Sequence, residues 1–107
     1  MEDEVEFRIS KLGPRVASTR DMLSFSEVDG ADVVIRCPPG TGASLNEKLV
    51  WLWGLLQLNR RKLKALQAEG ACLSCVCVTS HDTIVLQPNA AEFLHLVGAS
   101  LTITTRP

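Results

Sequence analysis

One stretch, from Ser44 to Glu69, has the apolar periodicity of a long helix and limits what the rest of the chain can form. Ser44 and Glu47 have the spacing of a capping box, and Gly70 is a typical helix terminator. One side of the predicted helix is apolar throughout, formed by Leu45, Leu49, Leu52, Leu56 and Leu63. We expect this stripe to pack on a sheet.

The first half of the same stretch is also apolar on its other side. Val50, Trp51, Gly54 and Leu58 lie there, and the basic run RRKLK follows from Arg60, which we interpret as a solvated face. An aromatic side chain beside a glycine suits a subunit or partner interface. The alternative is that the segment from residue 15 to 25 covers Trp51 and Leu58 within the monomer.

Short alternating segments predict strands around this helix. They are VEFRIS (5–10), ADVVIRC (31–37), ACLSCVCVT (71–79), TIVLQ (83–87) and SLTITT (100–105), with a second helix at PNAAEFLHLV (88–97). The segment KLGPRVASTRDMLSF (11–25) could be a short helix or a loop. We predict a single α+β domain over residues 1–107, with a four- or five-stranded, mainly antiparallel sheet and one long and one short helix on one face.

Charge and hydropathy exclude several classes of partner. The formal net charge is -1, so no field attracts nucleic acid. The longest apolar run, residues 49–58, is shorter than a membrane span, and the acidic start MEDEVE is unlike a signal peptide. We therefore expect a cytoplasmic protein with reduced thiols, no nucleic acid and no membrane among its partners.

The segment EGACLSCVCVTSHD (69–82) raises the question of a metal site. In a strand, Cys72 faces away from Cys75 and Cys77, which leaves two of the four ligands that zinc needs, with Cys37 or His81 as possible additions. Buried thiols explain this pattern better, so we expect no metal ligand and no cofactor.

Thiol catalysis is the next hypothesis, because His81 and Asp82 follow Cys77 closely. A catalytic cysteine needs an exposed, electropositive setting, whereas an apolar strand raises the thiol pKa. We therefore expect no catalytic residue and no enzymatic activity.

The segment CPPGTGAS (37–44) resembles the phosphate-binding loop of the AAA ATPase family, GPPGTGKT. The resemblance implies nucleotide binding, but Ala43 stands where the family has its phosphate-binding lysine, and Cys37 replaces the first glycine. A strand-to-helix turn is the alternative, with glycines that supply unusual backbone angles.

The C-terminal half resembles a bacterial family of unknown function. Comparable places are taken by Leu86, Pro88, Leu94, Gly98, Leu101 and Ile103, and FRIS (7–10) resembles the family's first strand. Thr102 and Thr104 stand where family members often carry Asp. The resemblance implies an α+β sheet with helices on one side and brings no activity with it.

These observations together predict a small non-enzymatic bacterial protein that acts by protein–protein binding. It would form a homodimer or bind a protein partner through Val50, Trp51, Gly54 and Leu58, in an immunity or regulatory type of role. The alternative is a small-ligand or metal-binding sensor, or a thiol enzyme, that uses the strand cysteines.

Overall fold

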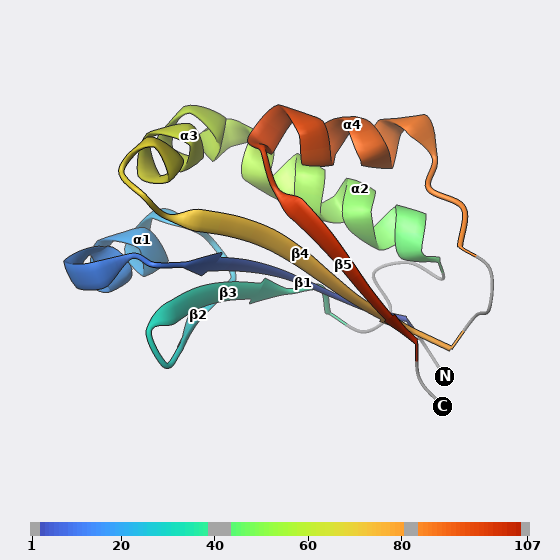
Figure 1. Ribbon diagram of the computed structural model, residues 1–107, viewed down its shortest axis with the longest axis horizontal. Coiled ribbons are helices and arrows are strands. Elements are labelled where there is room, and N and C mark those ends of the chain that lie inside the picture. Colours follow the sequence, from blue (N-terminus) through green and yellow to red (C-terminus); the bar gives the residue numbers. More distant parts are fainter. Residues whose placement is uncertain (1–2, 39–43, 81–83, 106–107) are drawn as a thin grey trace.

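A computed structural model of the chain describes residues 3–38, 44–80 and 84–105. Its centre is a five-stranded sheet in the order β2-β3-β1-β4-β5 (Figure 1). The strands are β1 (Glu4–Ser10), β2 (Ser26–Asp29), β3 (Asp32–Arg36), β4 (Cys72–Thr79) and β5 (Ser100–Thr105). The α+β class and the upper limit of the predicted strand number are confirmed.

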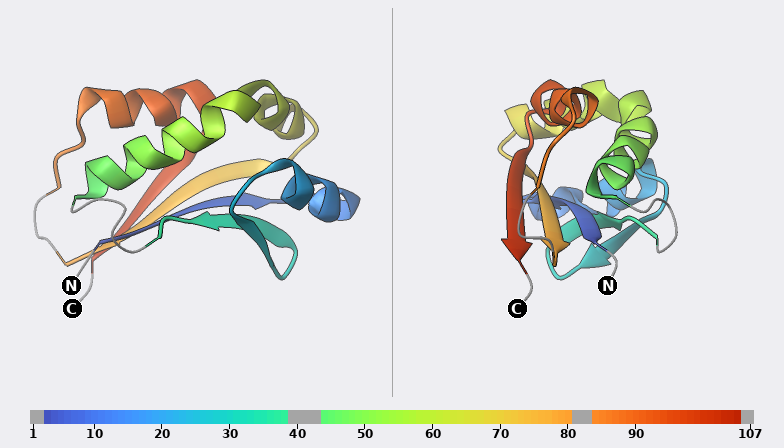
Figure 2. Two further views of the ribbon diagram at one scale, coloured as in Figure 1. Left: turned by 180° about the vertical axis from the view of Figure 1, so that it is seen from behind. Right: turned by 90° about the vertical axis from the view of Figure 1, so that its right-hand side faces the viewer.

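The helices of the described chain lie on one face of this sheet, and the opposite face is uncovered (Figures 1 and 2). They are η1 (Gly13–Arg15), α1 (Val16–Met22), α2 (Leu45–Leu56), η2 (Gln57–Asn59), α3 (Arg60–Ala68) and α4 (Pro88–Val97). No helix in these described ranges is long and apolar enough to cross a membrane.

The sheet is mixed, because its last pairing is parallel while the others are antiparallel. The expectation of a mainly antiparallel sheet is therefore corrected for the last strand. β1 pairs antiparallel with β3 and β4, whereas β5 pairs parallel with β4, from Ser74↔Ser100 to Thr79↔Thr105. The cause is α4, which carries the chain back along the sheet before β5 begins, as in other parallel crossovers.

The expectation of one long and one short helix is also incomplete. The stretch predicted as one helix is divided by the 3₁₀ turn η2 into α2 and α3, and the open segment 11–25 contains η1 and α1. β2 was not predicted from the sequence, because it is short and two of its four residues are acidic.

The predicted strand TIVLQ is wrong for its described residues, because Ile84–Gln87 forms no strand. The Asn46 side chain instead bonds the backbone there: its Nδ2 donates to Val85 O at 2.7 Å, and Gln87 N donates to its Oδ1 at 2.8 Å.

The core lies between the helices and the covered face of the sheet. The predicted leucine stripe of α2 and α3 is fully or nearly fully buried against it. Ser44 caps α2 as expected, with Glu47 N donating to Ser44 Oγ at 3.2 Å. Gly70 and Gly98 both have the positive φ expected of helix terminators.

Candidate interaction surface

The side chains of α2 divide into a flank that meets α4 and a flank that does not. On the first flank, Trp53 packs against Phe93 of α4 with ring centroids 5.5 Å apart. Trp51 projects to the other flank, where its ring contacts Phe25 at a centroid distance of 6.3 Å and an interplanar angle of 56°. The sequence-predicted residue Trp51 is therefore half-buried beneath an aromatic side chain from another element.

Phe25 occupies the turn between α1 and β2 in a left-handed backbone conformation, with φ of 62°. Such a φ is uncommon for a bulky residue and costs on the order of 1–2 kcal/mol. The hydroxyl of Ser26 holds the turn by donating toward the carbonyl oxygens of Leu23 at 2.6 Å and Arg20 at 2.9 Å. Phe25 remains 73% exposed, so the turn presents a large apolar ring to solvent.

Leu58 lies seven residues after Trp51, in η2, and is 88% exposed. Positions seven residues apart lie on the same flank of a helix. Val50 and Gly54 are also exposed but project from the outermost side of α2, and a Cβ at Gly54 would meet no atom within 4 Å. We define the Phe25 surface as Phe25, Trp51 and Leu58, with Val50 and Gly54 beside it.

The sequence raised the alternative that the segment 15–25 covers this face. In the structure this alternative holds for Trp51. The segment reaches Trp51 through Phe25 but leaves Leu58 in solvent. Phe25 is the member of the surface that sequence reasoning missed. The exposed position of Phe25 depends on a local turn. The adjacent serines, a residue type common in turns, were the sequence signal for it.

A basic surface adjoins Leu58. Arg60, Arg61, Lys62 and Lys64 of α3 are all exposed, and none forms an ion pair with another described residue. The Phe25 surface therefore has an uncompensated positive charge at one end.

The uncovered face of the sheet has the opposite character. Arg8 binds three carboxylates, with Nη2 to Asp29 at 2.7 Å, Nη1 to Asp32 at 2.6 Å and Nε to Glu6 at 3.1 Å. These bonds, that to Asp29 first, raise the arginine pKa above its ordinary value. Arg36 binds Glu6 and Glu27 beside them. Arg8 and Arg36 thus face four carboxylates, those of Glu6, Glu27, Asp29 and Asp32, so the cluster is net acidic.

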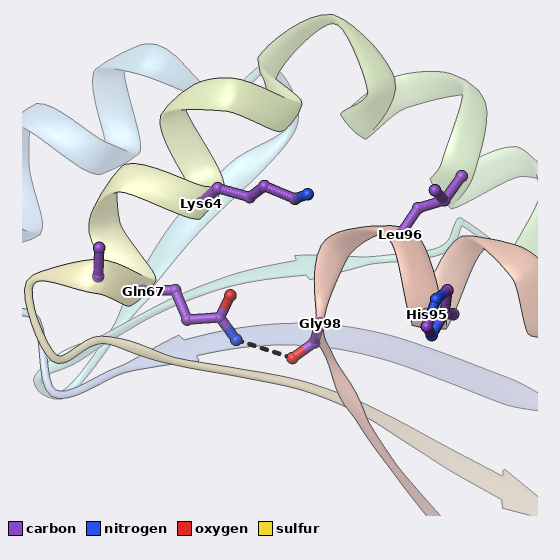
Figure 3. Close-up of a pocket in the computed structure, with 6 residues that line it drawn as sticks. Lys64, Gln67, His95, Leu96 and Gly98 are labelled. Atoms are coloured by element: carbon purple, nitrogen blue, oxygen red, sulfur yellow. Dashed lines mark hydrogen bonds between the residues drawn. The ribbon is translucent and has the colours of Figure 1, made fainter.

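A shallow depression of about 480 Å³ lies between α3 and α4 (Figure 3). Lys64, Gln67 and His95 are among its lining residues, and Gln67 Nε2 donates to Gly98 O at 2.9 Å. The hydrogen bond ties the end of α3 to the end of α4, so the depression includes a structural contact between the two helices.

The strand cysteines lie as the alternation predicts. Cys72 is exposed, whereas Cys75 and Cys77 are buried on the core side of β4. A hydrogen bond to Cys77 and burial both raise the pKa of Cys75 far above the ordinary thiol value. The same hydrogen bond lowers the pKa of Cys77, against burial and the nearby charge of Asp3. Among the described residues, no group of three potential ligands could hold a metal ion.

A buried polar group at one end of the core was not foreseen. Lys48, in the first turns of α2, is 1% exposed, and Asp3 and Thr79 are buried where β1 begins and β4 ends. Thr79 Oγ1 donates to Asp3 Oδ1 at 2.7 Å. A helical wheel already places Lys48 among the core leucines, since it precedes Leu52 by one turn.

The remaining sequence motifs fall largely outside the described residues. These are residues 39–43 of the CPPGTGAS segment, and His81 and Asp82. No protein-family model, curated protein or solved structure matches this chain. The resemblance to a bacterial family of unknown function therefore stays a prediction.

Proposed function

We propose that this chain is a non-enzymatic interaction module that binds another protein through the Phe25 surface. The observation that carries the proposal is the 88% exposure of Leu58, which helical spacing places on the flank of Trp51 and its partner ring Phe25. Exposed apolar groups that gather on one flank mark interaction sites more often than scattered ones do. Aromatic anchors surrounded by smaller apolar groups are also typical of binding hot spots.

The charge next to this surface indicates what the partner carries. Arg60 and Arg61 follow Leu58 directly in the chain, so a matching surface would have an apolar centre and carboxylates at that end. A two-fold contact of this surface with itself would gather the basic residues of both copies. The partner is therefore a different protein with an acidic margin.

The alternative hypothesis, a thiol enzyme or metal-binding sensor, has less support. The cysteine with the strongest pKa shift, Cys75, is shifted toward the protonated and unreactive form. Cys72, the exposed cysteine of the strand, lies on the opposite face of β4.

The test is native mass spectrometry of the tagged chain purified from its own host, in parallel with the Leu58→Glu variant. We expect the wild-type chain to carry a stoichiometric protein partner that the variant has lost. The matched control is Val85→Glu, because Val85 is also exposed but lies outside the Phe25 surface. A partner that is retained by Leu58→Glu, or lost equally from both variants, contradicts the proposal.

A charge reversal tests the chemistry of the partner. In the double variant Arg60→Glu/Arg61→Glu we expect slower association with the partner identified above and a weaker dependence of the rate on salt. Unchanged association kinetics would show that the partner's margin is not acidic.

A further inference from the structure

β5 forms one edge of the sheet, and no described strand pairs with its outer side. The right-hand view of Figure 2 shows it at the margin of the sheet, with no described strand beyond it. The backbone N–H and C=O groups that point outward from such an edge can pair with another extended chain.

This edge lacks the usual protection against pairing. Residues Ser100–Thr105 include no charged residue and no proline, and the register with β4 continues without a bulge. Charges, prolines and bulges are the devices by which sheets normally block their edges. Ile103, on the helix side of the sheet, is 38% exposed.

The opposite edge, β2, is protected. It has only four residues, and two of them, Glu27 and Asp29, are acidic. Self-pairing of β2 would bring these carboxylates close to their copies, which is unfavourable across strands. The two edges of one sheet thus differ in their capacity to pair.

β5 is complementary to itself when two copies run antiparallel. Centred on Ile103, the pairing sets Ile103 against Ile103 on the helix side and Thr102 against Thr104 on the uncovered side. Centred on Thr102, it sets Leu101 against Ile103. Both registers form an apolar pair on the helix side and hydroxyl pairs on the uncovered side, and the first also sets Leu101 against Thr105; apolar and hydroxyl cross-strand pairs are stabilising.

We propose that a second copy of this chain pairs antiparallel with β5 and joins the two sheets into one. A two-fold contact uses both β5 edges at once and closes the assembly, whereas β5 against β2 would propagate an open filament and meet acidic residues. The contact is separate from the Phe25 surface and does not depend on the function proposed for it. Its small size makes the dimer dependent on concentration.

Sedimentation velocity of the purified chain over a range of concentrations tests the proposal, together with Ile103→Lys and the matched variant Val28→Lys. Val28 is an exposed β-branched residue on the same side of the opposite edge. We expect the wild type and Val28→Lys to dimerise with similar constants, and Ile103→Lys to raise the dimer Kd by at least roughly tenfold. Circular dichroism spectra and melting temperatures check that both variants fold.

Hydrogen exchange provides a readout that does not depend on substitution. We expect the amides of residues 100–105 to exchange more slowly as the protein concentration rises, and those of β2 to be unaffected. A monomer at every concentration overturns the proposal. So does a dimer that Leu58→Glu dissociates and Ile103→Lys does not, because self-association would then use the Phe25 surface.

Discussion

Phe25 covers Trp51 with its ring while its own backbone is held at a φ of 62°, a conformation that suits glycine better than phenylalanine. The arrangement stabilises the aromatic pair at the expense of the turn. A residue kept in an unfavourable conformation and also exposed has little structural reason to be large. Substitutions at Phe25 can therefore distinguish the stability of the fold from the presentation of the apolar surface.

Substitutions at Phe25 should reverse the usual order of alanine and glycine. We expect Phe25→Gly to be more stable than Phe25→Ala by roughly 1 kcal/mol, because glycine adopts a positive φ without steric cost. Urea denaturation measures the difference. The control is Ala17→Gly in the exposed part of α1, which should lower the free energy of unfolding by roughly 1 kcal/mol. Equal stabilities of the two Phe25 variants would mean that the turn relaxes when the ring is removed.

Leu56 and Leu58 are two residues apart and should respond very differently to truncation. Leu56 is completely buried, so Leu56→Ala should cost roughly 2–5 kcal/mol. Leu58→Ala should change the free energy of unfolding by less than roughly 0.5 kcal/mol, because Leu58 is exposed. Denaturant unfolding of both variants makes the comparison. A large loss in Leu58→Ala would place this residue in the core and remove the basis for the Phe25 surface.

The sequence predicted most of the scaffold because alternation and helical periodicity depend on burial alone. The core stripe from Leu45 to Leu63 and the orientation of the strand cysteines follow from these two periods. The parallel pairing of β5 did not follow, since the direction of a strand depends on the path of α4 across the sheet. The break at η2 lies within residues that also suit a continuous helix.

The candidate surface was predicted in part. Trp51 and Leu58 were identified from the two-sided apolar pattern, but their difference in exposure depends on the position of Phe25, which no periodicity encodes. The burial of Lys48 is the opposite case, because the helical wheel places Lys48 on the core side although lysine is rarely fully buried.

Gly98 and Gln67 form a contact that should behave non-additively. Gly98 has a φ of 67°, and a Cβ there would lie 2.9 Å from Gln67 Nε2, the atom that donates to Gly98 O. We expect Gly98→Ala to cost roughly 1–2 kcal/mol through backbone strain and displacement of this amide. In a Gln67→Ala background the cost should fall, because the collision is absent. A double-mutant cycle by thermal or urea unfolding measures the coupling, and strict additivity would contradict the contact.

Arg8 should contribute more to the stability of the fold than its partly exposed position indicates, because it neutralises three carboxylates on the uncovered sheet face. We expect Arg8→Met to lower the free energy of unfolding by roughly 1–2 kcal/mol at low ionic strength, allowing for the screening of the exposed Asp29 pair. Salt should reduce the loss by screening the carboxylates left behind. The matched control, Arg20→Met, removes one exposed pair with Asp21 and should cost less than roughly 0.5 kcal/mol.

Cys75 should make the protein sensitive to alkaline pH. The hydrogen bond to Cys77 and burial hold its folded pKa far above the unfolded value of about 8.5, so above that pH the unfolded chain releases a proton that the folded chain retains. The unfolded state then binds fewer protons, and the free energy of unfolding should fall with rising pH by up to about 1.4 kcal/mol per unit. The folded pKa of Cys77 is lowered by the hydrogen bond with Cys75, so its contribution has the opposite sign: it is fully present above the unfolded value and does not add to the fall there.

Urea unfolding at several pH values between about 8.5 and 10 measures this slope in the wild type, Cys72→Ala and the double variant Cys75→Ala/Cys77→Ala. We expect Cys72→Ala to retain the slope, since Cys72 is exposed, and the double variant to lose most of it; both thiols are removed because without Cys75 burial would raise the pKa of Cys77 instead. The chain contains no tyrosine, so no phenol titrates in the same range. An equal slope in all three proteins would contradict the prediction, because the fall in stability would then arise from groups other than the buried thiols of β4.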